Sequence, residues 1–257
     1  MTVVVGILCE DGVVIGSDSS ASLAAGQFRT VEQPAKKTFI VSDHIIMAGT
    51  GQMGIGQRFE NVLLAIATAI KCYQTDPFQI AKTICADAIK DFGSTNCPTG
   101  QFGALVAFQS NKGCHLCEFA VADFQPEFKT DEQWFGSMGS GQVITDPFLG
   151  MLRRVFFNHR KPKLSEGLFA ATWAIKHAIE LNPGGINGPP QIAALRAEPP
   201  SKRMTARLLT EDELSEHDGN IEGVERHIGQ YRQILGGGGA PEVTTTTAPP
   251  EPPAPKK

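Results

Sequence analysis

The residue after the initiator methionine carries two groups that can carry out hydrolysis together. Thr2 leads directly into an apolar run, Val-Val-Val-Gly-Ile-Leu. If Met1 is removed, the Thr2 hydroxyl can attack a carbonyl, and the Thr2 α-amine, with a pKa of about 7.7–8.0, can accept the hydroxyl proton. This chemistry needs a nearby cation, a carboxylate that holds the cation, and a donor for the developing oxyanion. Many chains begin Met-Thr without using the threonine, so the interpretation depends on finding these neighbours.

Asp18 and Lys37 are the candidates for the carboxylate and the cation. Asp18 ends the second of two β-branched runs, which a Glu-Asp-Gly turn separates, and a hairpin of these runs brings Asp18 back towards Thr2. Lys37 alternates with Phe39 and Val41, so it shares a strand face with apolar residues. A buried lysine needs a carboxylate. The alternatives are a turn-capping aspartate and a solvated lysine at a strand end.

Two glycine-rich segments are candidates for binding the oxyanion and the amine. The segment "GTGQMG" (49–54) joins an expected strand to a helix, where glycines let backbone N–H groups approach a ligand. Ser140, between two glycines in "MGSGQ", could orient the amine or a water molecule, or cap the next helix. Neither segment fits a phosphate loop or a dinucleotide-binding fingerprint.

The order of the expected elements is strands, two helices, strands, two helices, strands. A parallel α/β sheet would alternate single strands and helices, so this order favours an α+β fold. We expect a four-layer αββα sandwich, with two antiparallel sheets between two helix pairs. Ser165 is the expected cap of the fourth helix, and residues 21–35 are expected to form a loop. The expected strands cover 2–9, 13–20, 36–42, 44–50, 103–121 (as a hairpin), a short strand at the start of 133–144, 191–198 and 203–210. The expected helices cover 58–73, a segment from 77, a segment that follows the glycine turn of 133–144 and ends at 157, 164–181 and about 218–235.

Composition places these elements in one globular domain. The chain has 257 residues, 41% of them hydrophobic, and a formal net charge of −4. No run of Lys and Arg exceeds two residues, which argues against nucleic-acid binding. No segment is apolar over a membrane-spanning length, and no secretory signal is present, so we expect a cytoplasmic protein. The domain is predicted to cover 2–235, and the Gly/Thr/Pro-rich residues 236–257 are predicted to be a disordered tail.

Six cysteines are interpreted as reduced, mostly buried thiols. Cys114 and Cys117 form a C-x-x-C pair, but a metal site would need a second ligand pair. In the expected hairpin these two residues point to opposite faces of a strand. We therefore expect neither a metal nor another cofactor.

Taken together, four segments resemble the proteasome β-subunit family of N-terminal-nucleophile hydrolases. They are "TVVVGILCEDGVVIGSDSSAS", "KKTFIV", "AGTGQMGIGQ" and "MGSGQ", and their order and spacing match the family from about Thr2 to Leu195. The sequence looks most similar to bacterial homologues that assemble from one type of subunit. The resemblance implies the αββα fold of these hydrolases and a threonine-type peptidase.

The resemblance also assigns roles to individual residues. Thr2 matches the nucleophile, Lys37 the catalytic lysine, and Asp18 the acid that binds this lysine. Gly51 matches the glycine whose N–H serves the oxyanion hole, and Ser140 the serine near the threonine amine. Two further residues, Gly49 and Met53, would line the pocket for the substrate residue before the scissile bond.

One segment departs from the family pattern. The family has an aspartate and a serine before a Gly-Gly pair, whereas this chain has "ELNPGG" (180–185). Glu180 could replace the aspartate with a longer reach, but Pro183 has neither a hydroxyl nor an N–H. Three functions follow: a threonine peptidase, an amidase of the same superfamily acting on small molecules, and a catalytically impaired ring scaffold. The resemblance implies a homo-oligomeric ring or double ring, protein or peptide substrates and a possible ATP-dependent unfoldase partner, without nucleic acid or membrane.

Overall fold

The computed structural model describes residues 1–25, 28–97, 100–182, 184–198 and 203–235. The chain divides into two compact units, Met1–Asp218 and Gly219–Lys257. The segment 236–257, for which we predict disorder, lies outside the described residues. Among the described residues, no helix has both the length and the apolar character needed to cross a bilayer.

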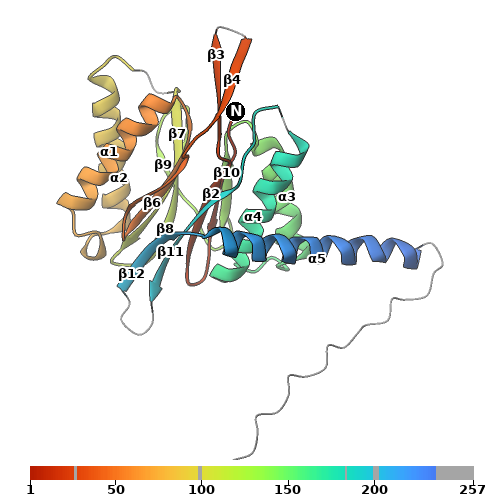
Figure 1. The fold of residues 1–257 in the computed structure, drawn as a ribbon. Helices are drawn as coiled ribbons and strands as arrows, with labels where there is room; N and C mark the ends of the chain where they lie inside the picture. Colours follow the sequence, from red (N-terminus) through yellow and green to blue (C-terminus); the bar gives the residue numbers. More distant parts are fainter. Residues whose placement is uncertain (26–27, 98–99, 183, 199–202, 236–257) are drawn as a thin grey trace, which may run out of the picture. The chain divides into compact units, whose positions relative to one another are not determined.

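Two five-stranded antiparallel sheets form the centre of the first unit (Figure 1). The first sheet has, in spatial order, β10 (Phe135–Met138), β1 (Val4–Leu8), β2 (Gly12–Ser17), β11 (Gln191–Glu198) and β12 (Arg203–Leu208). The second sheet has β5 (Thr38–Ser42), β6 (Ile45–Gly51), β7 (Phe102–Ser110), β8 (Gly113–Phe119) and β9 (Pro126–Phe128). Strands of one sheet contact strands of the other, so the two sheets pack face to face.

Helix pairs cover the outer faces of both sheets. Helices α1 (Met53–Ala69) and α2 (Pro77–Gly93) pack on the second sheet, and a short 3-10 turn, η1 (Cys72–Gln74), connects them. Helices α3 (Gln142–Val155) and α4 (Leu164–Leu181) pack on each other and on the first sheet. The αββα sandwich is therefore confirmed. Because a helix covers one face of β1 and β2 and a sheet the other, every residue of both strands is buried.

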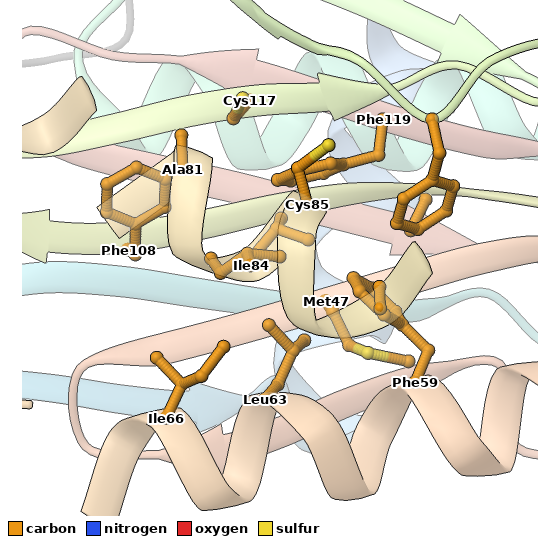
Figure 2. Packing of buried hydrophobic residues seen from close by; sticks show 14 of the residues in the cluster. Met47, Phe59, Leu63, Ile66, Ala81, Ile84, Cys85, Phe108, Cys117 and Phe119 are labelled. Carbon is orange, nitrogen blue, oxygen red and sulfur yellow. The ribbon is translucent and has the colours of Figure 1, made fainter. Parts of the chain in front are cut away.

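The side chains between the second sheet and its helices form a large apolar cluster. Figure 2 shows Phe59, Leu63 and Ile66 of α1 pointing into the cluster, with Met47 of β6 beside Phe59 and Leu63; Phe108 of β7 belongs to the same cluster. Residues of α2, among them Ile84, reach the same cluster. Spacings of three and four along both helices produce these inward stripes. The cluster holds α1, and with it the end of β6, in a defined position.

The two cysteines of the C-x-x-C pair lie on opposite faces of β8, as their spacing predicts. The Cys117 side chain belongs to the cluster beneath α2 (Figure 2). The Cys114 thiol instead lies 4.0 Å from the sulfur of Met204, on β12 of the other sheet. Burial raises the pKa of the Cys114 thiol to about 11, and it also raises the pKa of Cys117. Both thiols therefore remain protonated near neutral pH.

Four details differ from the sequence-based predictions. The expected loop 21–35 contains a hairpin, β3 (Ser20–Ala25) paired with β4 (Phe28–Pro34). The segment is rich in small residues and lacks the apolar alternation of a half-buried strand, so its pairing is not evident from the sequence. Helix α1 begins at Met53 rather than at 58, because tertiary packing outweighs the low helix propensity of Gly54 and Gly56.

The other two differences concern helix starts. Lys163, not Ser165, is the N-cap of α4, and Ser165 lies inside the first turn. The Glu166 side chain accepts a hydrogen bond from the Lys163 backbone N–H, which is the return bond of a capping box and sets the helix start at Lys163. Helix α5 covers Glu211–Leu235 and so begins seven residues before the predicted start at 218. The Thr210 hydroxyl accepts from the Glu213 N–H at this start, a capping signal that the sequence analysis did not use.

Candidate active site

The hairpin of β1 and β2 brings Asp18 next to the start of the chain. Val4 pairs with Ser17, so Asp18 lies opposite Val3. The Val3 N–H donates to Asp18 Oδ1 at 3.0 Å, and the Asp18 N–H donates to the Val3 carbonyl at 3.3 Å. Asp18 is fully buried. The proximity of Asp18 to Thr2, which the hairpin pattern predicts, is therefore present in the structure.

Asp18 and Lys37 form a buried ion pair beside Thr2. The Lys37 Nζ lies 2.8 Å from both carboxylate oxygens of Asp18, and the Lys37 side chain is only 10% exposed. Burial lowers the pKa of Lys37, and the negative charge of Asp18 opposes that shift. The Asp18 carboxylate also accepts from the backbone N–H groups of Ser20 and Asn187, so its charge is well compensated.

Thr2 and Lys37 converge on one carbonyl oxygen. The Thr2 hydroxyl donates to the carbonyl oxygen of Met1 at 2.8 Å, and Lys37 Nζ donates to the same oxygen at 3.1 Å. The lysine thus lies close to the hydroxyl that could act as a nucleophile. While Met1 is attached, the Thr2 nitrogen is an amide and cannot act as a base. Removal of Met1 would leave an amine at this place, next to the positive charge of Lys37.

The turn from β10 into α3 holds the backbone of Thr2. The Thr2 N–H donates to Ser140 Oγ at 3.1 Å, and the Gly141 N–H donates to the Thr2 carbonyl at 3.1 Å. Gly139 has a φ of +89°, and a Cβ at this position would lie 2.4 Å from the Thr2 carbonyl oxygen. Only glycine allows this approach. Ser140 is therefore within hydrogen-bond distance of the nitrogen that removal of Met1 would convert into the α-amine.

A cavity of about 620 Å³ opens next to Thr2. Its lining includes Lys37 together with Gly49, Gly51 and Met53, the residues that the family resemblance places at the oxyanion hole and the substrate pocket. Gly51 ends β6 with a φ of +118°, and a Cβ there would clash with the Gln101 carbonyl oxygen. The rest of the wall is mostly apolar: Phe39, Met47 and Phe102 belong to it. Thr2, Lys37 and the glycine segment thus line one cavity.

Glu180 is not brought to this group. It is exposed near the end of α4 and does not line the cavity. Pro183 lies outside the described residues. From the segment that follows α4, the contact with the ion pair is made by the backbone N–H of Asn187, 3.4 Å from Asp18 Oδ2. The expected role of Glu180 as a replacement for the family aspartate at this site therefore has no support in its position.

Gln191 holds the segment that carries Lys37, a contact that the sequence analysis missed. Gln191 Oε1 accepts from the backbone N–H groups of Lys37 and Thr38, at 2.9 and 3.2 Å. Its Nε2 donates to the Ala35 carbonyl at 3.0 Å. The contact joins residues more than 150 positions apart along the chain, so no local pattern could predict it. Gln191 ties β11 to the start of β5 and thereby orients Lys37.

We expect Gln191→Ala to destabilise the protein and weaken any activity that depends on Lys37. The substitution leaves two backbone N–H groups and one carbonyl without their partners, which costs about 1–3 kcal/mol in the free energy of unfolding. Chemical denaturation measures this loss. Gln79→Ala, at an exposed position of α2, is the matched control and should change stability by less than about 0.5 kcal/mol. Equal stability of the two variants would contradict a holding role for Gln191.

The geometry brings together the groups that hydrolysis by an N-terminal nucleophile needs. The site contains a hydroxyl, a nitrogen that removal of Met1 would convert into an amine, a buried cation and a cavity. Within the described part of the chain, no group of three or more His, Cys, Asp or Glu residues is placed to hold a metal ion.

Known proteins resemble this chain over most of its length. A model of the proteasome subunit family matches residues 2–187. The chain is 26% identical to a proteasome subunit beta of Methanocaldococcus vulcanius, with 85% of this chain and 90% of the relative covered. It is 33% identical to a proteasome subunit beta of Methanocaldococcus jannaschii, with 73% of this chain and 78% of the relative covered. It is 25% identical to a proteasome subunit beta of Methanobrevibacter smithii, with 73% of this chain and 83% of the relative covered. These three relatives are archaeal, whereas the sequence looked most similar to bacterial homologues.

Proposed function

We propose that this chain, which belongs to the proteasome subunit family, is a threonine-type peptidase subunit with Thr2 as its nucleophile. The observation that carries the proposal is the convergence of the Thr2 hydroxyl and the Lys37 ammonium on one carbonyl oxygen, with Asp18 buried behind the lysine. The family match covers this region of the chain. The relatives that the chain matches are named proteasome subunit beta.

In the proposed reaction, Thr2 forms and then loses an ester. After removal of Met1, Thr2 Oγ1 attacks the carbonyl carbon of the scissile bond, and the α-amine takes the hydroxyl proton. The Gly51 N–H stabilises the oxyanion. The ammonium then gives its proton to the leaving amine, and an ester of Thr2 remains. Water attacks this ester, the amine takes the water proton and returns it to Thr2 Oγ1, and the acid product leaves.

Each neighbour of Thr2 has a distinct role in this scheme. The Lys37 positive charge disfavours protonation of the α-amine and so keeps it available as a base near pH 7. Asp18 compensates the buried charge of Lys37 and holds its position. Ser140 Oγ, next to the Thr2 nitrogen, orients the amine. Gly49 and Met53 line the part of the cavity that takes the residue before the scissile bond.

The proposed subunit works in an assembly. Proteasome subunits form multi-subunit rings, and we propose that this chain forms a homo-oligomeric ring or double ring with its sites facing an inner chamber. An ATP-driven unfoldase would supply unfolded chains to such a chamber. Light scattering tests the assembly: a single species of 27.6 kDa, the mass of one chain, would contradict it.

Covalent trapping tests the nucleophile directly. A peptide epoxyketone closes a ring with a hydroxyl and an α-amine of the same residue, so it reports both groups at once. We expect intact mass to show loss of Met1 and peptide mapping to place the adduct on Thr2. A chain that has lost Met1 but forms no adduct contradicts the proposal. Hydrolysis of small amides without cleavage of casein would instead favour a small-molecule amidase, and no hydrolysis at all would favour an inactive ring scaffold.

A further inference from the structure

The last helix carries an apolar stripe with the spacing of a coiled-coil seam. In α5 (Glu211–Leu235), apolar residues recur at alternating intervals of three and four. The stripe consists of Ile221, Val224, Ile228, Tyr231 and Leu235. This is the a/d pattern of a heptad repeat. The three glycines of this part of the helix, at 219, 223 and 229, all fall outside the a and d positions.

The C-terminal half of this stripe is strongly exposed. Ile228 and Tyr231 are each 61% exposed, and Leu235 is 79% exposed. Outside the stripe most side chains of the helix are polar or charged, so the stripe is its main apolar face; Ile221, at the start of the stripe, is only 3% exposed. Exposed apolar residues in a continuous row mark interaction surfaces. The heptad spacing indicates that the occupant is another helix with the same repeat.

The charges beside the stripe select a second copy of the same helix in antiparallel orientation. If Ile228 packs against the partner's Tyr231, then Val224 packs against the partner's Leu235. This register places Glu225 beside the partner's Arg232 and, by the two-fold symmetry, Arg232 beside the partner's Glu225. The Glu225–Arg232 pair and its symmetry mate are then of opposite charge, which favours this pairing.

A parallel pairing lacks this complementarity. In parallel register the neighbour of Arg232 is the partner's His227, which repels it when the histidine is charged, and Glu225 meets the partner's Asn220. The antiparallel pair has four apolar layers, so it is weak by itself. Chains that are already held together in an assembly have a high effective concentration, which strengthens such a contact.

We propose that α5 is an assembly helix, which pairs antiparallel with α5 of a second copy of this chain through the stripe at 224–235. The pairing does not require the proposed peptidase activity. It assigns a function to the C-terminal helix, which lies outside the region matched by the family model.

Disulfide trapping in the full-length protein tests the orientation. Ile228→Cys chains and Tyr231→Cys chains are expected to form a mixed covalent dimer under mild oxidation. Its yield should exceed that of either variant alone by about tenfold, because only the mixed pair brings the two Cβ atoms within disulfide distance. The parent chain, oxidised under the same conditions, reports the background from the native cysteines. Dimers formed mainly by Ile228→Cys alone would indicate parallel pairing, and an absence of dimers above background would indicate no pairing; either result overturns the proposal.

Charge reversal tests the register. Arg232→Glu, introduced into both cysteine variants, should lower the yield of mixed dimer several-fold, because two repulsive pairs replace two attractive ones. Adding Glu225→Arg should restore the yield. The two positions are seven residues apart and do not contact each other within one helix, so restoration can come only from contact between chains. Arg226→Glu, on the outer side of the same helix, is the matched control and should leave the yield unchanged. A double variant that stays as low as the single variant would refute the register.

Discussion

Thr2→Ala is expected to lower the rate of peptide hydrolysis about 10⁴-fold or more, while the protein keeps its fold and stability. The substitution removes the hydroxyl that forms the ester, and no other group of the site can replace it. The side chain is small and sits at the chain terminus, where it makes one hydrogen bond, to Met1. The measurement is the steady-state cleavage of casein and of fluorogenic peptides by the purified assembly.

Thr2→Ser is the matched control for this experiment. Serine keeps a hydroxyl and an α-amine on one residue, so we expect this variant to retain measurable activity and to react with the epoxyketone. Intact mass must show that both variants lose Met1 to the same extent, because retained Met1 blocks the amine in either case. Hydrolysis that is unchanged in Thr2→Ala would show that another residue is the nucleophile.

Asp18→Asn is expected to cost about 3–5 kcal/mol in the free energy of unfolding and to impair hydrolysis as well. It leaves the ammonium of Lys37 buried without a counter-charge, and breaking one partner of a buried ion pair is strongly destabilising. It also removes the charge that opposes the burial-induced lowering of the Lys37 pKa, so this pKa falls further. Lys37 then loses its charge at a lower pH than in the parent protein. Chemical denaturation at several pH values measures both effects.

Asp131→Asn is the matched control for Asp18. Asp131 is 75% exposed and pairs with Lys161 on the surface, where an ion pair contributes at most about 1 kcal/mol. Its replacement should leave stability and hydrolysis nearly unchanged. If both aspartates prove equally dispensable, then the buried pair neither stabilises the fold nor supports the site.

The sequence was sufficient to predict the fold class, since the order of apolar runs and helical stripes distinguishes an αββα sandwich from an alternating α/β sheet. The hairpin signal between β1 and β2 was enough to bring Asp18 to Thr2, because the turn sets the register. The β3–β4 hairpin was not predicted. Within the described part of the chain its strands pair only with each other, and neither strand shows the apolar pattern of a core strand.

The candidate site was predicted to a different extent for each residue. Thr2, Asp18, Lys37 and Ser140 come together as the patterns and the resemblance imply. Glu180 was chosen for its residue type near a departure from the family pattern, yet a side chain at the exposed end of α4 does not reach the cavity.

The sequence by itself determined the chemistry available to this protein: a threonine at the start of a buried strand, a carboxylate one hairpin away and a lysine on an apolar strand face. These features follow from local spacing, because successive side chains along a strand point to opposite faces of the sheet. Only the tertiary structure decided how the lysine is held. The supporting groups are the Gln191 side chain and the Asn187 backbone, which lie much later in the sequence than Lys37. Such contacts depend on how the two sheets and the segment after α4 pack together, and no local pattern in the sequence records that arrangement.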